Sequence, residues 1–361
     1  MAEAFPDDHV LSEVRGHLGI ITLNRPKALN ALSLGMVDHL LSVLDDWKDE
    51  PEVKAVLIRG TGKAFCSGGD VRAVAMAPKG EAASELSRAF FHNEYVLNYR
   101  INTFPKPFVA LIGGIVMGGG AGVSVHGSHR IADETTLFAM PETVLGLFPD
   151  VGASWFLNRC PGETGLYLAL TGQRLRAADL LSLGLATHYV PSARTGELIE
   201  ALVAAGRNGD GLDKAAIDLV LAEFAQDPGS APLTAHRDAI DAAFAAATVE
   251  EIVSNLERID ADWAREALAV FHRASPLSLK ITLRELRAAR GQSLAEALRT
   301  EFRLAVRVSR GADFAEGVRA ILIDKDNKPN WTPARLDAVG ASDLDPYFAP
   351  FGTSADELDL A

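Results

Sequence analysis

The sequence has few cysteines, little positive charge and no long apolar run, and each shortage excludes a class of protein. Its 361 residues include 2 cysteines, too few for a disulfide framework, so we expect a reducing, intracellular setting. The net charge of −13 argues against nucleic acid as a partner, because phosphate backbones need a basic face. No run approaches the roughly 18 apolar residues of a membrane span, so no membrane is expected as a partner.

The sequence also lacks the signatures of targeting segments and common cofactors. Residues 1–9 are acidic, without an apolar or Arg-rich targeting pattern, which predicts a cytoplasmic protein. His, Cys, Asp and Glu show no metal-ligand spacing, and neither a P-loop nor a dinucleotide fingerprint occurs. We therefore predict no metal and no separate cofactor.

What is present predicts an α/β protein with two regions. Residues 1–195 alternate short apolar strands with helices in a repeated ββα order, which is typical of an α/β core. One of these helices is expected to begin after the N-cap Ser33 and to run to about Trp47. In residues 196–361 the strand pattern disappears and apolar residues recur at helical spacing, so this region is predicted to be mainly helical, with an irregular tail from about residue 330.

Two glycine-containing loops are candidate binding sites for a developing negative charge. Residues 118–120 are three glycines between an expected strand and an expected helix of small residues over 121–128. Residues 65–70, Phe-Cys-Ser-Gly-Gly-Asp, form the second loop. Two backbone N–H groups that converge on one carbonyl oxygen would stabilise an oxyanion. Either loop alone could equally be an ordinary tight turn.

Two acids accompany these loops. Glu142 and Asp150 lie eight positions apart (150 − 142) in the stretch Pro-Glu-Thr-Val-Leu-Gly-Leu-Phe-Pro-Asp, each beside a proline. Amide donors together with two carboxylates are the parts that an acyl-transfer site needs.

The order and spacing of these motifs resemble the crotonase (enoyl-CoA hydratase/isomerase) superfamily. The resemblance rests on Ile-Ile-Thr-Leu-Asn-Arg-Pro at 20–26, on residues 62–70 and 118–120, and on Phe-Ala-Met-Pro-Glu at 138–142. It implies a crotonase-like spiral of ββα units that binds acyl-CoA thioesters. It also implies an oxyanion hole formed by the backbone N–H groups of Ser67 and Gly119.

The acids indicate which reaction of the superfamily to expect. Hydratases of this family use two glutamates; Glu142 matches the second, but Gly122 stands where the first would be. Asp150 stands where hydratases usually have glycine. Residues 140–152, with Glu94-Tyr95 and residues 275–282, 313–320 and 324–331, resemble the thioesterase branch of 3-hydroxyisobutyryl-CoA hydrolases, which implies a role in valine breakdown. The alternatives are a hydratase or isomerase, and a non-catalytic acyl-CoA-binding protein.

Roles for individual residues follow from the resemblance. Glu142 would attack the thioester carbonyl or activate water, and the sequence leaves both routes open. Asp150 would bind the 3-hydroxyl group or position water. Glu94 would be a third polar group in the pocket, although an ordinary solvated carboxylate is nearly as compatible with its spacing.

The resemblance also implies where the coenzyme part of the substrate binds. The phosphates and the adenine edge would be bound by Arg25, Lys27, Ala28 and Leu29. The adenine and pantetheine entrance would be flanked by Asp70 and Val71. CoA would be part of the substrate and not a cofactor. Relatives often form homo-oligomers, so self-association is a further expectation.

Overall fold

The computed structural model describes residues 8–76, 81–207, 211–353 and 356–360. The chain divides into two compact units, and each is made of three separate stretches. The first contains Met1–Gly69, Leu97–Phe138 and Arg174–Pro232, and the second contains Asp70–Val96, Ala139–Gln173 and Leu233–Ala361. The units interleave along the chain, whereas the boundary predicted near residue 195 separates regions by composition. That boundary stays a prediction, but every described element beyond it is helical or irregular.

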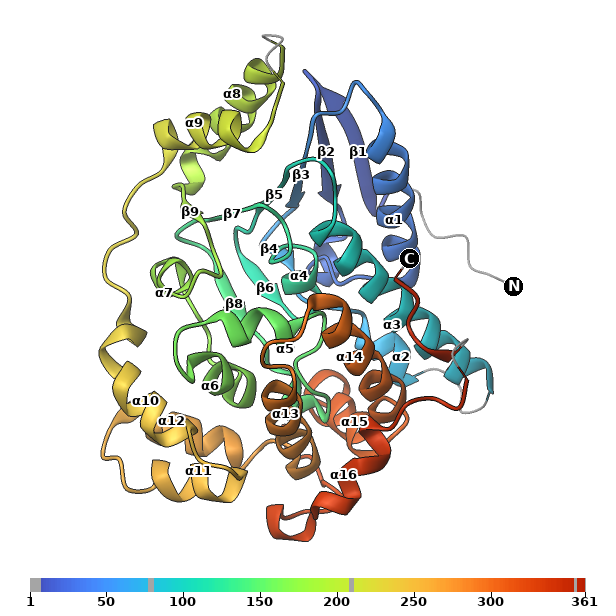
Figure 1. The fold of residues 1–361 in the computed structure, drawn as a ribbon, viewed down its shortest axis with the longest axis vertical. Coiled ribbons are helices and arrows are strands. Elements are labelled where there is room, and N and C mark those ends of the chain that lie inside the picture. Colours follow the sequence, from blue (N-terminus) through green and yellow to red (C-terminus); the bar gives the residue numbers. More distant parts are fainter. Residues whose placement is uncertain (1–7, 77–80, 208–210, 354–355, 361) are drawn as a thin grey trace. The chain divides into compact units, whose positions relative to one another are not determined.

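The first unit is built on two sheets (Figure 1). The larger sheet has the order β1-β2-β3-β5-β7-β9 and the smaller has the order β4-β6-β8. The strands are β1 (Val10–Arg15), β2 (Leu18–Leu23), β3 (Ala55–Gly60), β4 (Ala64–Cys66), β5 (Phe108–Leu111), β6 (Ile115–Met117), β7 (His129–Ala132), β8 (Leu137–Ala139) and β9 (His188–Tyr189). After the antiparallel β1–β2 pair, all neighbours in the large sheet are parallel. Each of β3, β5 and β7 is followed by a strand of the small sheet, which is the predicted spiral of ββ units.

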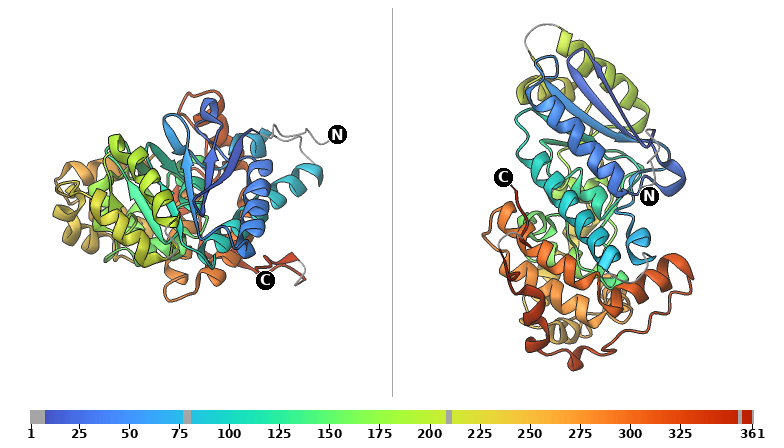
Figure 2. Two further views of the ribbon diagram at one scale, coloured as in Figure 1. Left: turned by 90° about the horizontal axis from the view of Figure 1, so that it is seen from above. Right: turned by 90° about the vertical axis from the view of Figure 1, so that its right-hand side faces the viewer.

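Helices cover both faces of the large sheet, as Figure 2 shows. The helical segments of this unit are η1 (Pro26–Ala28), α1 (Leu34–Asp49), α4 (Gly119–Gly122), α7 (Ala177–Ser182), η4 (Ser192–Arg194), α8 (Thr195–Arg207) and α9 (Lys214–Phe224). Leu18 and Ile20 of β2 share a core cluster with apolar residues of α8 and α9. Gly19 lies on the opposite face, where an added Cβ would come within 2.5 Å of the Trp47 ring of α1. The period-2 alternation of β2 therefore separates the two helical layers.

Two predicted helices near the candidate site can be compared with the structure. Ser33 is the N-cap of α1, and its side chain accepts a hydrogen bond from the Met36 amide at 3.3 Å, as predicted. The helix expected over 121–128 is wrong, since only the single turn Gly119–Gly122 is helical. Glycine disfavours helix, and the Ser124 hydroxyl donates to the Gly120 carbonyl at 2.8 Å, a local bond that competes with a regular helix.

The second unit is helical. Its elements are α2 (Val71–Met76), most of α3 (Glu81–Asn102), η2 (Glu142–Leu145), α5 (Ala153–Phe156), η3 (Leu157–Arg159), α6 (Thr164–Thr171), η5 (Pro232–His236), α10 (Arg237–Phe244), α11 (Val249–Leu256), α12 (Asp262–Phe271), α13 (Pro276–Ala288), α14 (Leu294–Val308), α15 (Ala312–Val318), the π-helical η6 (Arg319–Ile323), η7 (Leu336–Ala338) and α16 (Ala341–Phe348). Every residue of α6 is buried, and this helix packs against α10, α12 and α13. Among the described helices none is long and apolar enough to span a membrane.

The chain end is more ordered than predicted. We expected an irregular tail, but α16 forms despite Pro346 inside it. Asp343 accepts a hydrogen bond from the Gly340 amide at 2.7 Å and so caps the first turn. An acid three residues after the N-cap Gly340 was the signal that the prolines obscured.

Candidate active site

The two glycine loops of the first unit lie against each other. Strands β4 and β6 are parallel neighbours, so the loops that follow Cys66 and Met117 leave the same edge of the small sheet. Gly68 has φ +118°, and a Cβ added to it would lie 3.3 Å from the Met117 carbonyl and 3.8 Å from the Gly119 nitrogen. A Cβ on Gly120 would come within 2.2 Å of the Cys66 carbonyl. Glycine is therefore required because backbone meets backbone here.

The hydrogen bonds show which amides are available, and they correct one prediction. The Ser67 amide donates to the Leu29 carbonyl at 3.0 Å, so it is already paired and does not fit the predicted role of oxyanion donor. Two positions on, the Gly69 amide has no acceptor in the described part of the chain, and neither has that of Gly119. Gly69 therefore replaces Ser67 as the candidate beside Gly119. Spacing in the sequence could not show which of several consecutive amides is engaged.

The segment predicted to bind the coenzyme is held beside these loops by a buried amide. The Asn30 side chain accepts from the Arg25 amide at 2.8 Å and donates to the carbonyls of Thr61 and Ala64 at 2.9 and 2.8 Å. These three bonds fix the loop that carries Arg25, Lys27, Ala28 and Leu29 on one side of residues 61–69. The structure thus groups the predicted residues, while their contacts with CoA stay a prediction.

Within that loop the cations differ in availability. The Arg25 guanidinium donates to the Ala31 carbonyl at 3.1 Å and helps to close the turn. Lys27 is exposed and has no ion-pair partner among the described residues. Further along, Asp70 accepts a hydrogen bond from the Ala73 amide at 3.2 Å, so its carboxylate caps α2, which begins at Val71.

The acids belong to the second unit, where they are deeply buried. Glu142 opens η2 and is 5% exposed, Asp150 is 5% exposed, and Glu94 on α3 is 2% exposed. Tyr95, fully buried next to Glu94, donates its hydroxyl to Asp150 Oδ2 at 2.7 Å. Tyr95 is a site residue that the sequence did not predict; its place directly after Glu94, a predicted pocket acid, was the available signal.

Burial raises the pKa values of all three acids, and charge repulsion adds to the rise for the two glutamates. Burial, followed by the charge of Asp150, raises the pKa of Glu142 well above its usual range, and the same two causes act on Glu94. Burial raises the pKa of Asp150 to about 6, and the hydrogen bond from Tyr95 opposes this rise. All three carboxyls therefore hold their protons more strongly than exposed acids do. Perturbed carboxyls in such a group are typical of catalytic sites.

Glu142 Oε2 and Glu94 Oε1 are buried and have no hydrogen-bond partner within the described residues. Buried polar atoms normally find a partner, so these two oxygens are suited to meet a ligand or water. In hydratases of the family the first of the two glutamates would lie on α4, at the position of Gly122, but α4 consists of Gly-Gly-Ala-Gly and offers no carboxylate there. The site thus has one acid set, and all its members lie in the second unit.

The C-terminal motifs hold the short helix that carries Glu142. The Ser275 amide donates to the Thr143 carbonyl at 3.1 Å. Asp313 accepts from the Ser275 hydroxyl at 2.5 Å and from the Thr332 amide at 2.8 Å. A Cβ on Gly317 would come within 2.3 Å of the Leu145 carbonyl, so α15 and η2 touch through their backbones. These contacts explain why residues far along the chain accompany the acid motif.

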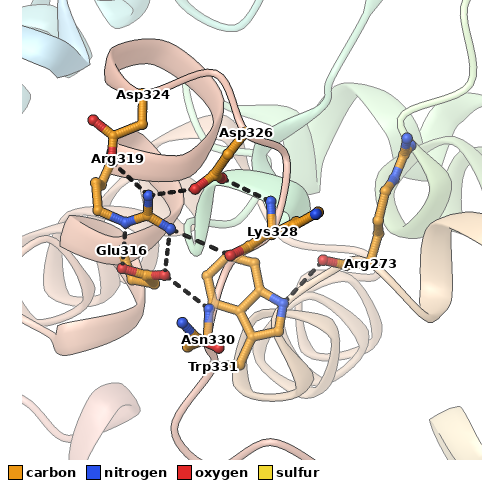
Figure 3. Close-up of polar contacts among 8 residues, drawn as sticks. All are labelled: Arg273, Glu316, Arg319, Asp324, Asp326, Lys328, Asn330 and Trp331. Carbon is orange, nitrogen blue, oxygen red and sulfur yellow. Dashed lines mark hydrogen bonds and ion pairs between the residues drawn. The ribbon is translucent and has the colours of Figure 1, made fainter.

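The motif at 324–331 is organised by one guanidinium (Figure 3). Arg319 binds Glu316 with two 2.9 Å contacts and reaches Asp324 and Asp326 at 2.6 and 2.7 Å. The Trp331 indole then donates to the Arg273 carbonyl at 2.9 Å. This turn closes the chain onto the second unit and supplies no acid to the site.

Other features of the second unit contribute no alternative site. A surface cavity of about 640 Å³ lies next to the ion pair of Arg290 and Glu163 and contains none of the buried acids described above. In the residues that the structure describes, no group of three or more His, Cys, Asp or Glu side chains could hold a metal ion.

Known proteins are similar to this chain over most of its length. A model described as enoyl-CoA hydratase/isomerase matches residues 18–348. The mitochondrial 3-hydroxyisobutyryl-CoA hydrolase of Homo sapiens is 46% identical over 96% of this chain and 90% of its own length. The 3-hydroxyisobutyryl-CoA hydrolase 1 of Arabidopsis thaliana is 46% identical over 96% and 93%.

Solved structures confirm the predicted crotonase-like fold. A carnitinyl-CoA dehydratase from Mycobacterium thermoresistibile has a TM-score of 0.90 at 40% identity, covering 98% of this chain and 99% of that one. An enoyl-CoA hydratase from Rhodobacter sphaeroides has a TM-score of 0.86 at 38% identity, covering 97% and 99%. With its fold, its glycine loops and its sequence all in agreement, the chain belongs to the enoyl-CoA hydratase/isomerase family.

Proposed function

We propose that this protein hydrolyses a short-chain 3-hydroxyacyl-CoA thioester, with 3-hydroxyisobutyryl-CoA as the preferred substrate, to give 3-hydroxyisobutyrate and CoA. The observation that carries the proposal is the buried set of Glu142, Asp150 and Tyr95, combined with the missing acid at Gly122. Relatives with 46% identity over nearly the whole chain bear the name of this hydrolase.

The first step of the proposed reaction is binding of the thioester carbonyl by two backbone amides. Gly69 and Gly119 would donate to the carbonyl oxygen and stabilise the negative charge that develops there. Removing one such donor typically costs about 100- to 1000-fold in rate.

Glu142 would then act on the carbonyl carbon by one of two routes. Its ionised carboxylate attacks to form an acyl-glutamyl anhydride and expels the CoA thiolate, which takes up a proton, after which water hydrolyses the anhydride. Alternatively the carboxylate removes a proton from a water molecule that attacks directly. Acid quenching during turnover, followed by mass spectrometry of the Glu142 peptide, separates the routes: an added acyl mass supports the first, and its absence under saturating substrate supports the second.

Asp150 would select the substrate. With a pKa of about 6 it is largely ionised above neutral pH. Its carboxylate, already fixed by Tyr95, can still accept the 3-hydroxyl of the acyl group, because a carboxylate offers several lone pairs. A buried acceptor that pairs with a hydroxyl also disfavours analogues without one, since it would then remain unpaired.

A free-thiol assay tests the proposal. We expect CoA release from 3-hydroxyisobutyryl-CoA, slower release from 3-hydroxypropionyl-CoA and little reaction with crotonyl-CoA. Loss of the enoyl absorbance of crotonyl-CoA at a comparable rate would contradict the proposal and favour the second candidate, a hydratase or dehydratase. That candidate deserves the direct test because the two solved structures above carry such names.

Three further expectations accompany the proposal and have their own tests. Full activity after dialysis against a chelator would support the expected absence of a metal or cofactor. Light scattering after gel filtration measures whether the chain forms a homo-oligomer. Fractionation of the source cells tests the cytoplasmic location, which matters because animal relatives are named as mitochondrial.

A further inference from the structure

A buried carboxylate on α14 accepts hydrogen bonds from the segment immediately after Asp150. Glu301 is fully buried, and its Oε2 accepts from the Gly152 amide at 2.6 Å. Its Oε1 accepts from the Ser154 amide at 3.1 Å and from the Ser154 hydroxyl at 2.6 Å. Burial raises the pKa of Glu301 to about 7, while these donors lower it. Three donors around one carboxylate form a strong and geometrically specific contact.

Residues 151–152 of this segment have an unfavourable backbone conformation that the surrounding contacts must stabilise. Val151 has φ +57° and Gly152 has φ +85°, so two consecutive residues lie in the left-handed region. A β-branched residue such as Val151, which is also buried, rarely adopts this conformation and persists in it only when its surroundings enforce it. This turn points the N–H groups of Gly152 and Ser154 toward the same place, and the Glu301 carboxylate accepts hydrogen bonds from both.

The same helix supports Asp150 from its other side. Phe302, the next residue of α14, packs edge-on against the Tyr95 ring with centroids 6.4 Å apart and an interplanar angle of 80°. Tyr95 in turn donates to Asp150 Oδ2. Consecutive residues of α14 thus constrain both the side chain of Asp150, through Tyr95, and the backbone that follows it.

We propose that Glu301 is a positioning residue that sets the orientation of Asp150 toward the 3-hydroxyl of the substrate. The proposal rests on the proposed function, because it assigns Glu301 to the selectivity of that same site. Glu301 does not touch substrate; it acts through the loop 151–154.

The test compares Glu301→Gln with the parent at pH 8, using 3-hydroxyisobutyryl-CoA and isobutyryl-CoA, which lacks the hydroxyl. A glutamine can accept on one side only, so either Gly152 or Ser154 loses its acceptor. We expect the ratio of the two kcat/KM values to fall by about 10- to 100-fold, as small misplacements of a binding group do. The value for isobutyryl-CoA should stay within about threefold, because the Gly119 and Glu142 machinery is untouched.

Glu285→Gln is the matched control. Glu285 is another buried glutamate of the second unit, on α13, but neither of its oxygens has a hydrogen-bond partner among the described residues. Glu285 interacts with the charges of Asp150 and Glu301 but makes no hydrogen bond to Gly152 or Ser154, so Glu285→Gln controls for charge alone and should leave the ratio unchanged. If Glu301→Gln lowers both kcat/KM values in parallel, or leaves both unchanged, the positioning role is refuted.

Two further experiments keep the positioning role testable. A milder variant serves if Glu301→Gln misfolds, and a measurement without substrate serves if the proposed function is wrong. Ser154→Ala removes one donor and should lower the same ratio by a smaller factor. Hydrogen exchange of the Gly152 and Ser154 amides should be slow in the parent and faster in Glu301→Gln. Unchanged exchange would contradict the hydrogen bonds of these amides to Glu301. A folded parent that hydrolyses neither thioester would instead refute the proposed function, and the exchange rates would still judge the contact.

Discussion

Two buried glutamates in the second unit differ in what their surroundings allow them to do. Glu142 lies with Asp150 and Glu94, and the charge of Asp150 contributes to its raised pKa. Glu285 is equally buried, and burial followed by the charges of Glu301 and Asp150 raises its pKa well above the usual range. Glu285 has no place in the proposed chemistry, so the pair allows a substitution to be compared at constant burial and chemistry.

We expect Glu142→Gln to lower kcat for the 3-hydroxyacyl thioester by about 100- to 10,000-fold, the usual contribution of a positioned acid or base. Glutamine can neither attack the carbonyl nor take up a proton. The KM should change little, since the amides of Gly69 and Gly119 still bind the carbonyl. Glu285→Gln should keep nearly full activity in the same thiol assay. Retention of activity by Glu142→Gln would remove the central residue of the proposal.

Gly120→Ala tests the contact between the two glycine loops. The new Cβ would come within 2.2 Å of the Cys66 carbonyl, and neither backbone can move without shifting Gly69 or Gly119. We expect a loss of about 1–3 kcal/mol in stability, as for other overpacked sites, and a loss of activity larger than the stability change explains. Thermal unfolding and the thiol assay measure the two effects.

The control for that substitution is Gly196→Ala in α8. No atom lies within 4 Å of its added Cβ, so alanine should fit and raise stability by up to about 1 kcal/mol. An equal effect of both substitutions would show that the close backbone approach at Gly120 is unimportant.

Among the elements, the C-terminal turns explain why motifs distant in sequence accompany the acid site. Asp313 and Ser275 hold η2, and Arg319 closes the turn that follows (Figure 3). The contacts of Arg319 are largely exposed, and isolated surface ion pairs contribute little, but four contacts from one guanidinium confer local order. The expected result is therefore a change in local opening more than in global stability.

Arg319→Ala should make the turn a substrate for trypsin. The bond after Lys325 becomes accessible when Asp324 and Asp326 lose their common partner, and we expect cleavage there to accelerate by about tenfold or more, because local opening exposes the chain. The bond after Lys328 is followed by Pro329 and serves as an internal control that trypsin does not cut. Arg335→Ala, whose ion pair with Asp337 spans only two residues, should leave the rate unchanged. Equal cleavage in both variants would contradict the role of Arg319.

At the scale of the whole molecule, the buried acids make activity depend on pH. Glu142 must be ionised to act, and burial together with the charge of Asp150 raises its pKa, so kcat/KM should rise with pH over a range above that of an ordinary glutamate. Asp150→Asn removes a negative charge that raises the pKa of Glu142, so the acidic limb of the profile should move to lower pH. A limb that moves upward, or does not move, would show that the two carboxyls do not interact.

The buried Glu285 should make folding stability depend on pH in a predictable direction. The folded-state pKa of Glu285 lies above its unfolded value, so its contribution to stability is complete at pH below about 4.3 and is lost as pH rises toward the folded-state pKa. Glutamine cannot ionise. The Tm of Glu285→Gln minus that of the parent should therefore increase with pH above about 4.3, where each tenfold difference in proton affinity corresponds to about 1.4 kcal/mol. A difference independent of pH would show that Glu285 is not buried as described.

Much of this protein could be predicted from local sequence. The Ser33 cap of α1 and the glycine-containing loops are short-range patterns, and the structure has both as expected. The family and the acids Glu142 and Asp150 followed from motif order. The absence of the helix expected over 121–128 was not predictable, because the hydrogen bond from the Ser124 hydroxyl to the Gly120 carbonyl depends on local geometry that composition does not describe.

The sequence by itself determined the fold class and the family, and it predicted the acids of the site, because these depend on residue types at fixed spacing along one segment. Only the tertiary structure decided which groups are engaged. It paired the Ser67 amide with Leu29 and left Gly69 without an acceptor, and it brought Tyr95 and Glu301 to Asp150 from helices 55 and 151 positions away (150 − 95 and 301 − 150). Hydrogen bonds and burial depend on residues distant in the chain, so the pKa values and positions of the acids were settled by packing and not by motif.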